Sequence, residues 1–345
     1  MDLTIVQFLL QDGIMNGAIY ALLGLALVLV FLVTRVIFIP QGEFVTFGAL
    51  SLAFLTHGRV PGTVHLLVVL GAMVCLVEAV SAWRTRRWHG FGRTLLWALV
   101  LPLVLEGLAW LVAGYDAPLA IQVLFALALV IPMGPMIYRL VYQPIQQASV
   151  LVLLIVSVAL HFALLGLGLL FFGAEGWRTP ALFEGSVQIG AVPWSAQTFL
   201  VLLTCGLLIV ALWLFFRRSL YGRALRATAV NRRGARLVGI STRMAGSLTF
   251  TMAAAIGALS GMLIAAVTTI YYDTGFLIGL KGFVAAIFGS LVSYPIAAAG
   301  AICIGIVEAF SSFWASAFKE VIVFTLTIPA LVWLSFGSTH IDEED

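Results

Sequence analysis

Apolar stretches long enough to cross a lipid bilayer recur along almost the whole chain, and they limit its fold more than any other feature. The hydrocarbon core of a membrane is about 30 Å thick, so a helix needs about 20 apolar residues to cross it. Measured in this way, the candidate segments are Gly13–Val33, Phe44–Thr56, Gly62–Trp83, Thr94–Gly114, Pro118–Tyr138, Ser149–Phe172, Ser195–Phe216, Met244–Ile270, Phe276–Val292, Ile296–Trp314 and Phe318–Phe336. Hydrophobic residues make up 62% of the 345 residues and charged residues only 10%, which is too apolar for a water-soluble domain of this size.

We therefore expect an all-α polytopic integral membrane protein, because backbone polar groups inside lipid must be satisfied within the spanning segment. The expected number is about 9–11 hydrophobic helices, of which nine are long enough to span outright. Two segments, Phe44–Thr56 and Phe276–Val292, are short and are flanked or interrupted by glycine and proline. These two are predicted to be broken or re-entrant.

The arginines predict the orientation of the chain. Arginines cluster in the loop Arg84–Arg93 and in the loop Arg217–Arg243, which holds eight arginines and no acid. Loops rich in Lys and Arg face the cytoplasm. This places the N-terminus outside, which in a bacterial inner (plasma) membrane is the periplasm. The same alternation places the following acids outside: Asp116, Glu175, Glu184 and Asp273.

The two short segments are the candidates for a substrate path. Glu43 follows Pro40 at the start of one, and both suit the first turn of a helix, where N–H groups are free. Unwound backbone at membrane depth survives only where protein or water satisfies it, so such segments often line a path. The alternative is a pair of ordinary surface loops. The predicted path residues are Gln41, Gly42, Glu43, Gly282, Phe283, Gly289 and Ser290.

A few ionisable residues lie within the apolar segments, where a charged side chain costs about 2.5–3.5 kcal/mol on insertion scales. Glu78 lies near a basic loop, so we expect it to pair with Arg84 or Arg86. Glu106 and His161 are more central. For these two we favour structural, hydrogen-bonded roles over a proton relay.

The chain has two lysines, Lys281 and Lys319, and neither lies in a phosphate-binding loop of the form G-x-x-x-x-G-K-[ST]. The chain therefore cannot hydrolyse ATP by the P-loop route, and any ATP must be bound by another subunit. No catalytic or metal-binding motif is present, so we expect no enzyme activity and no cofactor. Lys281 is predicted to pair with a carboxylate such as Glu308, or else to reach a lipid headgroup.

The loop Tyr221–Ile240 combines small apolar residues at helical spacing with many arginines. This pattern predicts a short amphipathic helix that docks in a groove of a partner protein. The alternative is a basic loop that lies on anionic headgroups. The residues predicted to dock are Gly222, Ala224, Arg226, Ala227, Asn231, Ala235 and Gly239.

Taken together, four stretches resemble permease subunits of branched-chain amino acid importers of the ATP-binding cassette (ABC) class, in particular the H-type permease of the leucine/isoleucine/valine system. They are Asn16–Leu22, Ile39–Phe44, Tyr221–Ile240, and Lys281–Gly289 with Gly305–Ala309. The resemblance implies that Tyr221–Ile240 contains the helix that couples the permease to an ATPase. It also implies four kinds of partner: a second homologous permease, two P-loop ATPases, a periplasmic substrate-binding protein and the bilayer, with no nucleic acid.

The chain departs from the family pattern in places that bear on substrate and organisation. We predict one permease domain over 1–345, with an extra helical hairpin at 58–116 and a coupling loop at 217–243. The family also includes importers of urea, amides and aromatic acids, and Pro40 and Gln41 replace the usual residues beside the predicted path. The expected cargo is therefore a branched-chain or other hydrophobic amino acid or a related small polar solute. The alternative is a secondary transporter or channel for a small solute.

Overall fold

The computed structural model of the chain describes residues 3–86, 88, 91–115, 117–183, 185–189, 192–326, 328–329 and 332. Three predicted features fall partly or wholly outside these residues. The acids Asp116 and Glu184 lie outside them, as does most of the C-terminal half of the predicted segment Phe318–Phe336.

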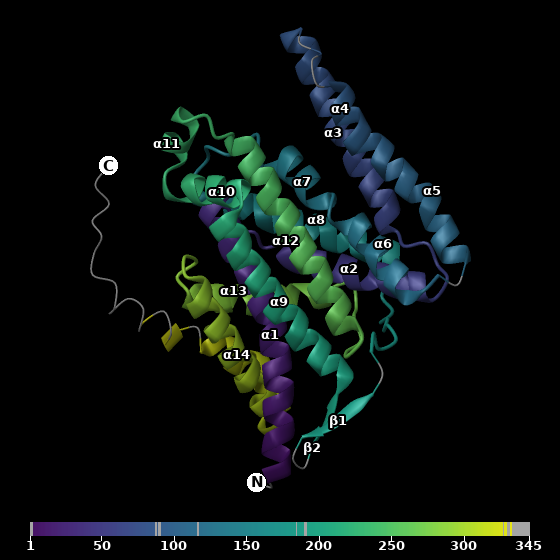
Figure 1. Ribbon diagram of the computed structural model, residues 1–345, viewed down its shortest axis with the longest axis vertical. Helices are drawn as coiled ribbons and strands as arrows, with labels where there is room; N and C mark the ends of the chain where they lie inside the picture. The colour runs from purple at the N-terminus through teal and green to yellow at the C-terminus, as the bar shows by residue number, and fades with distance from the viewer. Residues whose placement is uncertain are drawn as a thin grey trace. The chain divides into compact units, whose positions relative to one another are not determined.

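Helices dominate the described part of the chain, in which eight are long and apolar enough to cross a membrane. This confirms the predicted all-α polytopic class. The eight are α1 (Leu3–Thr34), α3 (Thr63–Thr85), α4–η1–α5 (Phe91–Leu95, Leu96–Val100, Leu101–Gly114), α6–α7–η2 (Leu119–Val130, Met133–Ile137, Tyr138–Tyr142), α8 (Val150–Phe172), α9 (Ala196–Arg218), α12 (Thr242–Ala265) and α14 (Tyr294–Trp314) (Figure 1). The π-helical turns η1 and η2 lie inside two of these spans.

The remaining helices are shorter. They are α2 (Gln41–Thr56), α10 (Leu220–Val230), α11 (Arg232–Leu237), α13 (Thr274–Phe288), a 3₁₀ turn η3 (Ser316–Phe318) and α15 (Lys319–Thr325). Two short spans were predicted, and α2 and α13 correspond to them. Helix α13 ends at Phe288 because Ser290 and Leu291 follow in the left-handed region, with φ of 53° and 57°, where a regular right-handed helix cannot continue.

Two features of the fold were not predicted. Helix α1 begins at Leu3 rather than Gly13, since no proline or glycine interrupts the chain between them. A small antiparallel hairpin joins β1 (Ser186–Ile189) to β2 (Val192–Ser195) in the connection between α8 and α9.

The chain divides into two compact units. The terminal unit comprises Met1–Val28, Phe183–Val210 and Ile278–Asp345, and the central unit comprises Leu29–Leu182 and Ala211–Leu277. Helices α1, α9 and α13 contribute residues to both.

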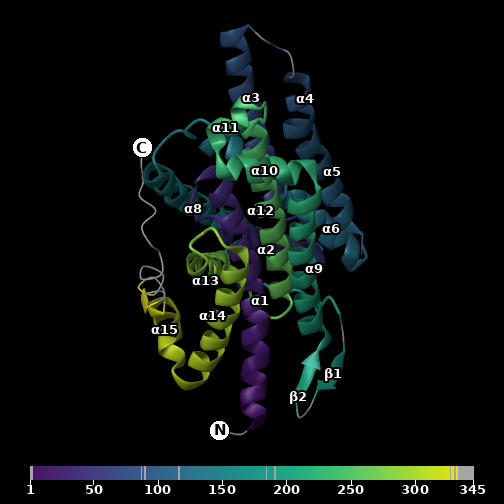
Figure 2. The ribbon, with the colours of Figure 1, turned by 60° about the vertical axis from the view of Figure 1, so that its left-hand side comes forward.

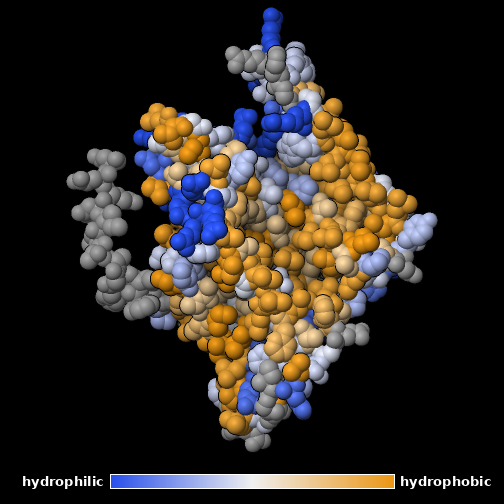
Figure 3. All heavy atoms as spheres, viewed as in Figure 1, coloured by the Kyte–Doolittle hydropathy of each residue, from blue (hydrophilic) through white to orange (hydrophobic). Residues whose placement is uncertain are grey.

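In the central unit, α3 and the composite helix α4–η1–α5 form a hairpin within the predicted region 58–116 (Figure 1). Its outward side chains are apolar and exposed, for example Leu76 at 66% and Trp110 at 66%. The space-filling view shows apolar residues over much of the visible face (Figure 3). Such a surface suits contact with lipid tails. That the hairpin is an addition to a smaller permease stays a prediction.

The core of the central unit is the contact between α2 and α12, which lie against each other (Figure 2). Glycines bring the two backbones together. A methyl group added at Gly48 would lie 2.6 Å from Cα of Ala258, and one added at Gly261 would overlap the carbonyl oxygen of Val45. In membranes, close packing of small residues is a main source of helix association.

This contact predicts that Gly261→Ala destabilises the protein. The added methyl group would overlap backbone that cannot rotate away, and overpacking of this kind costs about 1–3 kcal/mol. The thermal unfolding midpoint in detergent should fall. Gly166→Ala is the matched control, because a methyl group there meets no atom within 4 Å and alanine favours helix by about 1 kcal/mol. Equal midpoints for Gly261→Ala and wild type would show that the close approach is not required.

Candidate functional site

The start of α2 is buried and is held by contacts with two neighbouring segments of the central unit. Gln41 is fully buried and its Nε2 donates to the carbonyl of Ala253 in α12 at 3.0 Å. Gly42 allows another backbone to approach, since a methyl group there would overlap the carbonyl oxygen of Gly275. Two of the predicted path residues thus make close contacts inside the central unit, Gln41 with α12 and Gly42 with the backbone at Gly275.

Glu43, the third of these residues, pairs with His161 of α8. Glu43 is 1% exposed and His161 is 3% exposed, and Nδ1 of the imidazole lies 2.8 Å from Glu43 Oε1. The ring of Phe276 stacks on the imidazole, with centroids 4.4 Å apart. One turn along α2, the hydroxyl of Thr46 accepts a hydrogen bond from the N–H of Gly275 at 3.0 Å. Helices α2 and α8 and the first turn of α13 therefore meet at a polar site.

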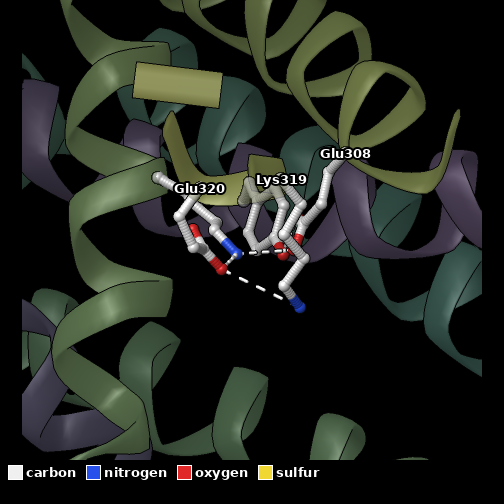
Figure 4. A network of polar contacts seen from close by, with 5 residues as sticks. Glu308, Lys319 and Glu320 are labelled. Carbon is white, nitrogen blue, oxygen red and sulfur yellow. Dashed lines mark hydrogen bonds and ion pairs between the residues drawn. The ribbon is translucent and has the colours of Figure 1, made fainter. Parts of the chain in front are cut away.

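The predicted pairing of Lys281 with Glu308 is confirmed, within the terminal unit. Lys281 Nζ donates to Glu308 Oε1 at 2.5 Å and to Glu320 Oε1 at 3.1 Å. The hydroxyl of Tyr20 donates to Glu308 Oε2 at 2.6 Å. Lys319 extends the network, 3.9 Å from Glu320, and Figure 4 shows Glu308, Lys319 and Glu320 gathered around these contacts. The lysine and Glu308 are both buried, so the network satisfies charges that lipid could not.

The other predicted path residues, Gly282, Phe283, Gly289 and Ser290, belong to the terminal unit. A methyl group at Gly282 would lie 2.6 Å from Cβ of Leu23, so this glycine permits close packing of α13 on α1. Phe283 is half-buried on α13, and Gly289 and Ser290 form the turn that ends it. A path that runs between this segment and Gln41–Glu43 stays a prediction.

The two acids of the hairpin, Glu78 and Glu106, have partners on the hairpin or next to it. Glu78 binds Arg139 at 2.7 Å, so the prediction of Arg84 or Arg86 as its partner is wrong. Arg84 and Arg86 follow Glu78 by six and eight positions, so on a continuous helix they would lie about 9 and 12 Å farther along its axis. Arg139 instead comes from a neighbouring helix. Glu106 lies 3.3 Å from His65, and both are partly exposed.

The predicted docking loop forms two short helices rather than one. Helix α10 carries Gly222, Ala224, Arg226 and Ala227, and helix α11 carries Ala235. Asn231 separates the two helices, because its side chain caps α11 by accepting from the N–H of Gly234 at 2.8 Å. Such capping by Asn is favourable at a helix start but not in a helix interior.

This pair of helices has a buried side and an exposed side. Leu225 and Ala235 are buried in the central unit, and Arg232 ties α11 to the carbonyl and side-chain oxygens of Gln146 at 3.2 and 2.9 Å. Hydrophilic residues gather over the region of α10 in the space-filling view (Figure 3).

The exposed side also carries apolar side chains. Val230 is 82% exposed, Leu237 is 89% exposed and Val238 is 75% exposed, and Gly239 closes the turn after α11 with φ of 85°. We call Val230, Leu237 and Val238 the apolar tip. Three strongly exposed apolar side chains on one short, arginine-rich segment favour a protein interface.

Comparisons with known proteins agree on one family. A family model described as "Branched-chain amino acid transport system / permease component" matches residues 9–331. The high-affinity branched-chain amino acid transport system permease protein LivH of Escherichia coli (strain K12) is 28% identical over 293 residues, covering 81% of this chain and 92% of that protein. LivH of Salmonella typhimurium is 28% identical over 297 residues, covering 81% and 92%. BraD of Pseudomonas aeruginosa, with the same description, is 27% identical over 293 residues, covering 82% and 94%.

Proposed function

Since the chain belongs to the family of permease components of branched-chain amino acid transport systems, we propose that it forms the membrane path of an ABC importer. Its cargo is a branched-chain or other hydrophobic amino acid or a related small solute. The observation that carries this proposal is the buried pair of Glu43 and His161 among apolar helices. Ionisable groups inside membrane spans are costly and generally serve a function.

Separate ATPase subunits energise the import. The chain has no P-loop, so ATP is bound by these partners and the chain itself needs no cofactor. The apolar tip of α10 and α11 is the surface on which an ATPase docks, because a partner would cover exposed apolar side chains next to arginines. A second permease subunit and a periplasmic substrate-binding protein complete the importer.

The importer lies in the bacterial inner membrane, with α10 and α11 in the cytoplasm and the N-terminus in the periplasm. The arginines of the loop Arg217–Arg243 support this orientation, since basic loops stay on the cytoplasmic side.

Transport by the reconstituted importer tests the proposed function. The chain is co-expressed with candidate ATPase, permease and substrate-binding subunits, purified and placed in liposomes, and uptake of radiolabelled leucine is followed with and without ATP. We expect uptake that requires both ATP and the ATPase subunits. Uptake by the permease alone, driven by an ion gradient, would instead identify a secondary transporter.

A further inference from the structure

From the site at the start of α2, and resting on the proposed function, we infer that Glu43 recognises a positively charged ammonium group on the transported solute. The group would bind the carboxylate oxygen that His161 does not occupy. The argument rests on hydrogen-bonding capacity, on charge and on the surrounding aromatic ring.

The two oxygens of the Glu43 carboxylate differ in their hydrogen bonding. Oε1 is engaged by His161 at 2.8 Å. Oε2 is buried, and no group among the described residues donates a hydrogen bond to it. A buried acceptor without a donor costs about 1–3 kcal/mol, and more when it is charged. A solute that supplies a donor would remove this cost.

The charge around this oxygen favours a cation over a neutral donor. Asp273, just before α13, is close enough to act electrostatically on the Glu43 carboxylate. Asp273 thus adds negative potential at the Glu43 carboxylate, and His161 opposes it. Arg and Lys side chains are not among the described hydrogen-bond or ion-pair partners of Glu43. An ammonium group would supply both the missing N–H donors and the missing positive charge.

The aromatic ring beside the pair adds to the preference. Phe276 is half-buried, and its ring stacks on His161. The face of an aromatic ring attracts a cation within about 6 Å of its centre. The apolar edge of the same ring suits the hydrocarbon side chain of an amino acid. An amino acid carries both features, whereas urea and simple amides carry neither a charge nor a large apolar group.

The neighbouring Gln41 does not share this site. It lies two positions before Glu43, and residues two apart on a helix do not face each other. Its Nε2 donates to the carbonyl of Ala253 in α12, and its Oε1, like Glu43 Oε2, receives no hydrogen bond from the described residues. The recognition of an ammonium group is assigned to Glu43, because its carboxyl can carry the complementary negative charge and the Gln41 amide cannot, with His161 holding the carboxylate in place.

The experiment compares the reconstituted complex with its Glu43→Gln variant. Radiolabelled leucine represents a solute with an ammonium group, and acetamide represents a neutral N–H donor. The readout is the number of solute molecules imported per ATP hydrolysed, which normalises for the amount of assembled complex. For Glu43→Gln we expect this ratio to fall about tenfold or more for leucine, since a charge-assisted contact is lost. Glu106→Gln is the matched control, because it disrupts a second Glu–His pair outside the site and should keep the wild-type ratio.

Each outcome decides a separate point. A wild-type ratio for leucine in Glu43→Gln would overturn the inference and leave the proposed function standing. A wild-type complex that imports neither probe would contradict both. Import of acetamide but not leucine would show that the cargo is neutral and that the ammonium assignment is wrong. If Glu43→Gln fails to assemble, Glu43→Asp decides the point. Aspartate keeps the negative charge, but its shorter side chain moves the carboxylate oxygen away from the site. A reduced ratio then supports the inference, and a wild-type ratio overturns it.

Discussion

Lys281→Met is expected to lower the free energy of unfolding by about 3–5 kcal/mol, the usual cost of removing one partner of a buried ion pair. Lys281 is 4% exposed and Glu308 is 7% exposed, so water cannot replace the lost ammonium group. Glu320 loses the same partner. Two carboxylates would remain close together without Lys281 between them. Thermal unfolding of the purified permease in detergent measures the effect as a lower midpoint.

Two further variants make this prediction specific. Lys319→Met removes the other lysine of the network, which is 40% exposed and 3.9 Å from Glu320. This variant should lower the free energy of unfolding by less than about 1 kcal/mol, because exposed ion pairs contribute little to stability. The double variant Lys281→Met with Glu308→Gln should recover part of the loss, because the buried charge is removed together with its partner. Similar midpoints for Lys281→Met and Lys319→Met would contradict a central role for Lys281.

Leu237→Asp is expected to abolish ATP-dependent import. Leu237 is 89% exposed and belongs to the apolar tip, where an ATPase is proposed to dock. A buried apolar contact at the centre of an interface contributes about 2 kcal/mol or more, and a carboxylate forced into the same place adds the cost of its desolvation. Co-purification of the ATPase subunits with the permease should fall at least tenfold, while insertion of the permease into the membrane is retained.

Val187→Asp provides the comparison. Val187 lies in β1 and is 55% exposed, so the same change is made at an exposed apolar residue outside the loop Arg217–Arg243. The ATPase subunits should co-purify with this variant as they do with wild type. Loss of the ATPase from both variants would point to a general defect, and retention by Leu237→Asp would remove the apolar tip from the interface.

The sequence was sufficient to predict features that depend on local composition. Runs of about 20 apolar residues predicted the spans, because length and hydropathy alone determine whether a helix can cross lipid. Lys281 could be paired with Glu308 for a similar reason, since a lysine inside an apolar region requires a carboxylate and few were available. The left-handed turn at Ser290 explains why α13 ends sooner than the apolar run predicted.

Contacts between segments that are far apart in the sequence could not be predicted from it. Glu43 and His161 are separated by 118 positions, and nothing in either local pattern indicated the other. Glu78 was assigned to arginines close in sequence, but its partner Arg139 comes from another helix. The β-hairpin was also missed, because its two strands of four residues are too short for a clear alternation of polar and apolar residues. For the two ion pairs the missing information was the packing of helices, which the chain encodes through small residues rather than through a motif.

The contact between α2 and α12 has a consequence for how this protein changes shape. Between Gly48 and Ala258, and between Gly261 and Val45, the backbones touch without a layer of side chains. Side chains at a helix interface can change rotamer and let one helix slide past the other, but backbone pressed against backbone has no such freedom. We therefore expect α2 and α12 to move together as one rigid body during transport. Any hinge of the central unit would then lie at the ends of these helices, and a disulfide engineered between them should leave the transport cycle intact.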